Sequence, residues 1–134
     1  MTPENNSTLS MTLEYSIKHE QSLIKVRAHG TGDYLSVHQL WQDIAVACKK
    51  YSCQKILGEA HIDAPNPIDG AYDHAAIFEA ASMTAEYRIA WVENNPEAKE
   101  PARLVEAVLR NRGLAVARVF DNIREAQRWL EEKP

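Results

Sequence analysis

Apolar residues occupy every second position in two early segments of the chain: Leu13, Tyr15 and Ile17, and then Ile24, Val26 and Ala28. This period of two is typical of a β-strand with one buried face. The polar stretch between the segments, from His19 to Ser22, is short enough for a tight connection. The pattern therefore predicts an antiparallel hairpin at the start of the folded part.

Beyond the hairpin the apolar positions take the three- and four-residue spacing of a helix, at Val37, Leu40, Trp41, Ile44, Cys48 and Tyr51. Ser36 and Gln39 form a capping-box pattern, which predicts a helix over residues 36–51. Ile56–Ile62 is typical of a third strand. A second helix is expected after Asn66-Pro67, with an apolar stripe at Ile68, Ala71, Tyr72, Ala75, Phe78 and Ala81 or Ser82.

The last third repeats the alternation of strand and helix. Tyr87–Val92 predicts a fourth strand, and Ala102, Val105, Val108 and Leu109 mark a third helix. That helix is expected to end at Gly113, because glycine adopts the left-handed conformation without steric cost. A fifth strand lies within 114–120. Asn122 and Glu125 form a second capping box, before a helix that packs Ile123, Ala126 and Leu130.

The predicted order is ββαβαβαβα, and parallel neighbours in a sheet need a covering helix between them. We therefore expect an α/β fold: a mixed, mostly parallel five-stranded sheet with covering helices. At 134 residues with 45% hydrophobic content, the chain suits one domain, over residues 12–132. Residues 1–11 are polar and aperiodic, which predicts a disordered tail, with Met11 as an alternative start of translation.

This order, together with Asn111-Arg112-Gly113, Val119-Phe120 and the ending from Glu125-Ala126 to Trp129-Leu130, resembles the SpoIIAA-like branch of the STAS superfamily. The resemblance extends from Leu13 to Leu130. Relatives in that superfamily include anti-sigma-factor antagonists, and the branch is linked to CRAL-TRIO-type lipid-binding domains. The resemblance implies a SpoIIAA/STAS-like fold and a regulatory or binding function.

In the anti-sigma-factor antagonists, a serine at the start of the helix after the third strand is phosphorylated to switch partner binding. Residues 58–81 of this chain contain no serine or threonine, although Asp63, Asp69 and Asp73 place carboxylates there. A carboxylate carries about −1 charge, where a phosphate carries about −1.5 to −2 and three acceptor oxygens. We therefore expect no phosphoserine switch of that type, and interpret Asp69 as complementing the helix dipole.

Charge and composition exclude several classes of partner. The net charge is 15 − 19 = −4, which gives no attraction for nucleic acid. No apolar run approaches the roughly 20 residues that span a bilayer, and no secretory leader is visible, so we expect a cytoplasmic protein. Cys48 and Cys53 match neither a CxxC redox pair nor half a zinc ribbon, and are expected to be free thiols.

Alternation places Glu59, His61 and Asp63 on one face of the third strand, and His74 follows on the next helix. His61, Asp63 and His74 are weak candidate metal ligands, because their spacing matches no metal signature. The chain has no Gly-rich phosphate loop and no nucleophile elbow, so we expect no cofactor and no catalytic residues. The alternative is a metal-dependent or acid-base enzyme that uses these residues together with Glu59.

The second helix carries one charge, Glu79, between Ala75 and Thr84, although a helix on one side of a sheet should be polar outside. Three explanations are open: the helix is buried on both sides, it lies at a homodimer interface, or it covers an apolar or lipidic ligand. It has no Lys or Arg for anionic headgroups, which disfavours adsorption and leaves only peripheral membrane contact open. The candidate residues for binding a protein partner or small apolar ligand are Tyr72, Ala76, Ile77, Ala80, Met83, Glu59 and His61. We interpret all three tryptophans as core residues.

Overall fold

The five strands form one sheet in the order β1-β2-β3-β4-β5. The computed structural model describes residues 13–63 and 67–132, with the backbone alone for 67–72. The strands are β1 (Leu13–Glu20), β2 (Leu23–Thr31), β3 (Lys55–Asp63), β4 (Arg88–Glu93) and β5 (Val116–Phe120). β1 and β2 are antiparallel, and each later strand is parallel to the one before it.

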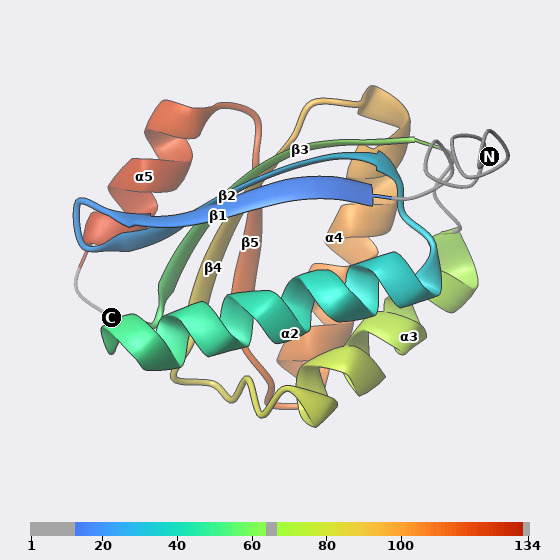
Figure 1. Ribbon diagram of the computed structural model, residues 1–134. Coiled ribbons are helices and arrows are strands. Elements are labelled where there is room, and N and C mark those ends of the chain that lie inside the picture. Colours follow the sequence, from blue (N-terminus) through green and yellow to red (C-terminus); the bar gives the residue numbers. More distant parts are fainter. Residues whose placement is uncertain (1–12, 64–66, 133–134) are drawn as a thin grey trace, which may run out of the picture.

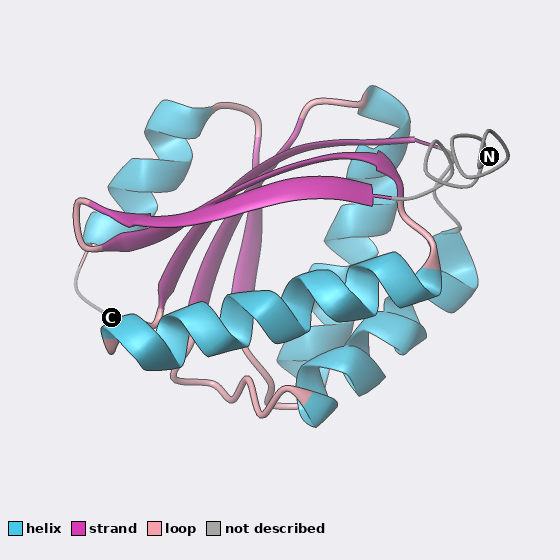
Figure 2. Ribbon diagram, in the orientation of Figure 1, coloured by secondary structure: helices cyan, strands magenta, loops and turns pink. Residues whose placement is uncertain are grey.

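Three helices cover one face of the sheet and a fourth covers the other (Figures 1 and 2). The three are α2 (Tyr34–Tyr51), α3 (Pro67–Ala80) and α4 (Pro96–Asn111), and the fourth is α5 (Ile123–Glu131). Each of the three connects parallel strands that are neighbours in the sheet. Because such crossovers share one hand, they place their helices on the same face. The predicted α/β class and element order are confirmed.

The start predicted for the first helix is wrong. α2 begins at Tyr34, and its N-cap is Asp33, whose side chain accepts a hydrogen bond from the backbone N–H of Ser36 at 3.0 Å. Ser36 therefore lies within the first turn, where its amide needs a partner, and the carboxylate of Asp33 satisfies it. The predicted end at Tyr51 is confirmed.

α4 begins at Pro96, six residues before Ala102, the first residue of its predicted apolar stripe. Asn95 is the N-cap, and Pro96 occupies the first turn, where a missing backbone N–H costs nothing. Asn95 and Pro96 therefore begin the helix directly after β4. At the other end of α4, the predicted left-handed glycine is confirmed, with φ of 68° at Gly113. Asn122 caps α5 as predicted and accepts from the N–H of Glu125 at 2.9 Å.

Each face of the sheet has its own core. The face under α2, α3 and α4 buries the larger set, including Ile24, Ile44, Ile56, Phe78 and Leu109. The face under α5 buries Leu23, Leu57, Ala90, Val92, Ala126 and Leu130. Ile123 was expected to pack there but is 39% exposed, because the buried face of this short helix begins only at Ala126.

Candidate functional site

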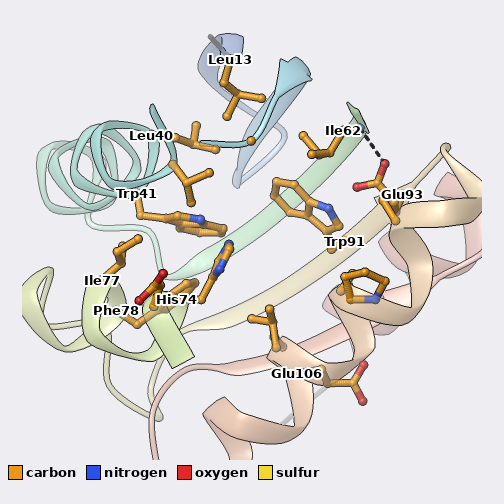
Figure 3. A pocket seen from close by; sticks show the side chains of 18 of the residues that line it. Leu13, Leu40, Trp41, Ile62, His74, Ile77, Phe78, Trp91, Glu93 and Glu106 are labelled. Atoms are coloured by element: carbon orange, nitrogen blue, oxygen red, sulfur yellow. Dashed lines mark hydrogen bonds between the residues drawn. The ribbon is translucent and has the colours of Figure 1, made fainter. Parts of the chain in front are cut away.

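A cavity of about 450 Å³ lies between the sheet and the three helices on its face (Figure 3). α3 packs mainly against α2 and α4 and makes few contacts with the strands. The space that α3 leaves open is closed at the sides by α2 and α4. The hollow is therefore a consequence of how the three helices are arranged over the sheet.

Aromatic and aliphatic side chains form most of the cavity lining. Trp41 comes from α2, Ile77 and Phe78 from α3, and Trp91 from β4. The ring centroid of Trp41 lies 4.5 Å from that of Phe78 and 5.7 Å from that of Trp91. Such a lining favours an apolar occupant, since apolar surface gains free energy when it leaves water.

Gly58 on β3 allows the indole of Trp91 to lie against the sheet. The two residues are register partners on neighbouring parallel strands. A Cβ atom built on Gly58 would lie 2.3 Å from the Trp91 ring, closer than any side chain tolerates. A glycine inside a strand is typical of such a close approach. Gly58 therefore sets the position of the indole, and with it the shape of the cavity.

One buried carboxylate lines the cavity at the end of β4. Glu93 is 2% exposed and accepts hydrogen bonds from the backbone N–H of Ile62 at 2.9 Å and of Asn95 at 3.3 Å. Burial raises the pKa of Glu93, while these bonds and a hydrogen bond with Trp91 act to lower it. Glu93 joins the ends of β3 and β4 to the start of α4.

The cavity reaches the carboxyl ends of the parallel strands, where ligands commonly bind in open α/β sheets. Thr31 ends β2, Ile62 lies near the end of β3, and Glu93 ends β4. Tyr34 and Asp73 also line the cavity and are exposed, so the cavity communicates with solvent beside them.

The structure places the candidate residues of α3 in different environments. Ile77 is 1% exposed and lines the cavity. His74, which the sequence offered as a candidate metal ligand, also lines it. Met83 follows the helix and is fully buried in the core, whereas Ala76 and Ala80 face solvent. The side chain of Tyr72 lies outside the described residues.

Glu59, His61 and Asp63 lie on the opposite face of the sheet from the cavity, by the alternation of β3. They take part in surface ion pairs there: Arg27 with Glu59 at 3.8 Å and His61 with Asp63 at 3.5 Å. The sheet therefore separates all three from His74. Among the described residues, no group of three or more His, Cys, Asp or Glu side chains could hold a metal ion.

Sequence reasoning missed the part that two tryptophans have in this site. Trp129 packs beside Phe120 on the α5 face, as expected for a core residue. Trp41 is a buried core residue and Trp91 packs against the same core, as expected, and both also line the cavity. The available signal was Gly58, a glycine within a predicted strand, which marks a close approach by another group.

The fold has a counterpart among solved structures. It is similar to the crystal structure of an anti-sigma factor antagonist from Mycobacterium paratuberculosis, with a TM-score of 0.63 and 13% identity over 90% of this chain and 96% of that one. The likeness confirms the predicted SpoIIAA/STAS-like fold. Neither a family model nor a curated protein matches the chain. In the described part of the chain, no helix is long and apolar enough to cross a membrane.

Proposed function

We propose that this protein is a non-enzymatic binding domain that holds a small apolar ligand between α3 and the sheet. The cavity supports this proposal, because its volume of about 450 Å³ lies within the range of small-molecule sites, roughly 300–1,000 Å³. Protein interiors otherwise contain few voids larger than a water molecule. A cavity of this size, lined by two indoles and a phenyl ring, exceeds an ordinary packing void and favours the binding of a small molecule.

A second candidate function is the binding of a protein partner. Tyr34 and Leu35, at the start of α2 near the cavity entrance, are 48% and 76% exposed. Exposed apolar side chains next to one another favour association, and the fold neighbour is named as an antagonist of a regulatory factor. Because residues 58–81 contain no serine or threonine, such binding would proceed without the phosphoserine switch.

The enzyme alternative has less support. Its candidate residues Glu59, His61 and Asp63 lie across the sheet from His74, so they do not converge on one cleft. General acid–base chemistry needs groups within hydrogen-bond reach of the same substrate. Elemental analysis of protein purified without a histidine tag tests this alternative, because metal bound in a stoichiometric amount would support an enzyme.

The test of ligand binding combines native mass spectrometry with a probe titration. Native spectra of gently purified protein report a retained small molecule and the oligomer mass together. The neutral probe N-phenyl-1-naphthylamine should bind with one site per chain. Ala102→Phe introduces a ring into the cavity from α4 and should abolish probe binding, whereas Val46→Phe adds the same ring to an exposed position of α2.

The outcomes separate the two candidate functions. Probe binding that Ala102→Phe removes and Val46→Phe preserves supports the cavity. Absence of probe binding in the folded wild-type protein, with no retained molecule in its spectrum, contradicts it. For a protein partner or a second copy of this chain, Leu35→Glu should abolish complex formation and leave probe binding unchanged.

A further inference from the structure

Acidic side chains line the cavity from every helix around it and from the sheet. Asp33 precedes α2, Asp73 lies on α3, Glu93 ends β4 and Glu106 lies on α4. Among the described lining residues there is no lysine or arginine, and His74 is the one residue able to carry positive charge. The ionisable lining therefore favours one sign of charge in the occupant.

The helix N-termini near the entrance do not reverse this preference. An uncapped N-terminus attracts anions through its free N–H groups. In α2 the N–H of Ser36 already donates to Asp33. In α4 the N–H of Glu97 donates to the Asn95 side chain at 3.1 Å, and the N–H of Asn95 itself donates to Glu93. Each cap therefore already uses a donor that an anionic head group would need.

Building on the proposed function, we infer that the cavity selects apolar ligands with a positively charged head group, such as an alkylammonium, and rejects the corresponding carboxylates. The head group would lie by Glu93 and Trp91, and the hydrocarbon would contact Ile77, Phe78 and Trp41. Indole rings attract cations through their π-faces, most strongly where water is excluded.

Glu93 is the strongest of the four acidic groups in this selection. It is 2% exposed, so its charge is poorly solvated and gains most from a nearby cation. Glu106 contributes less, because Arg110 lies 3.5 Å from its carboxylate. Asp73 is exposed and therefore screened by water. A carboxylate ligand would add a like charge beside the buried carboxylate of Glu93, which costs free energy.

The experiment compares three ligands with the same ten-carbon alkyl chain: decyltrimethylammonium, decanol and undecanoate. Displacement of N-phenyl-1-naphthylamine gives their dissociation constants, at pH 8 and low salt, where histidine side chains are mostly neutral. We expect the ammonium to bind about tenfold more tightly than the alcohol, and the carboxylate about tenfold more weakly.

Glu93→Gln keeps a carbonyl oxygen to accept the N–H groups of Ile62 and Asn95 and removes the charge. It should reduce the ammonium-to-carboxylate ratio by about tenfold. The matched control is Glu14→Gln, which removes the same charge from an exposed position on the other face of the sheet. Circular dichroism confirms that each variant is folded.

The first three outcomes need the wild-type protein alone. Ammonium bound more tightly than alcohol, and alcohol more tightly than carboxylate, supports the inference. Equal binding of ammonium and alcohol, or preference for undecanoate, overturns it and leaves the proposed cavity function intact. Binding of none of the three ligands, nor of the probe, overturns the proposed function itself. A loss of discrimination in Glu14→Gln equal to that in Glu93→Gln would show that net charge, rather than the cavity, decides.

Discussion

The two faces of the sheet are covered in different ways. α5 packs directly on β3, β4 and β5, and its Ala126 and Leu130 are fully buried there. On the other face α3 contacts its neighbouring helices more than the strands, and the cavity lies beneath it (Figure 3). A single helix can approach a sheet until its side chains interlock. Three helices in one layer must also pack against one another.

The comparison of the two faces indicates that one contributes mainly to stability and the other mainly to ligand binding. The α5 face is filled, so a truncation there creates a new void. The cavity face already contains a void, so a truncation of a lining side chain there enlarges that void. Dispersion contacts are lost in proportion to the atoms actually touched. Stability should therefore depend more on the filled face, and ligand binding on the hollow one.

The largest expected effect is the difference between Leu130→Ala and Ile77→Ala. Both side chains are almost completely buried, at 0% and 1% exposure. Leu130→Ala should lower the free energy of unfolding by about 4 kcal/mol, and Ile77→Ala by about 2 kcal/mol, because Ile77 borders an existing cavity. Urea denaturation measures both, with the exposed Leu35→Ala as a near-neutral control. Equal losses would contradict the division between the faces.

Gly58→Ala should produce the next largest effect. Its new Cβ would push the Trp91 ring toward the cavity, where there is room, so the cost should be about 1 kcal/mol, at the low end for overpacking. The displaced indole would occupy part of the cavity and weaken probe binding. Trp91→Phe in the Gly58→Ala background should recover stability, since the smaller ring avoids the clash. Unchanged probe affinity in Gly58→Ala would contradict this placement of Trp91.

Glu93→Gln should change how stability depends on pH. Burial raises the pKa of Glu93 in the folded protein above its ordinary value of 4.5. As pH rises from 4.5 through the raised value, the folded state holds more protons than the unfolded state, so the wild-type protein loses stability. The variant should lack this part of the decline. Urea unfolding across that range measures it, and a parallel decline in both proteins would refute the assignment.

Tyr15→Phe should give the smallest effect, confined to alkaline pH. Burial, followed by a 2.5 Å hydrogen bond to Asp43 and the charge of that carboxylate, raises the pKa of Tyr15 to about 12. An unfolded tyrosine ionises near pH 10, so stability falls as pH rises from 10 to 12. Tyr15→Phe should flatten that fall. Unfolding at about pH 9 and pH 11 tests it, and equal slopes would contradict the shift.

Much of the fold could be predicted because its signals are local. The alternation in residues 13–28 identified the hairpin, and the glycine at 113 and the cap at Asn122 fixed two helix ends. The errors arose where two local signals competed. Ser36 and Asp33 both suit an N-cap, and only the observed hydrogen bond from the Ser36 amide distinguishes them.

The candidate site was less accessible to sequence reasoning. No pattern in the sequence marks Glu93 at the end of its apolar strand as buried, but it accepts hydrogen bonds from backbone N–H groups of two separate segments. His74 and His61 looked like neighbours along the chain, yet the sheet separates them. Distances between elements depend on packing, which no spacing in the sequence records.

The sequence by itself determined the order and type of the elements, the α/β class and the absence of serine and threonine from residues 58–81, because these follow from periodicity and composition. Tertiary structure decided where the hollow lies and what lines it. That outcome depends on how far α3 stands from the sheet, and the contacts of α3 with α2 and α4 set this distance. The position of Trp91 over Gly58 likewise exists only once two strands are paired in register.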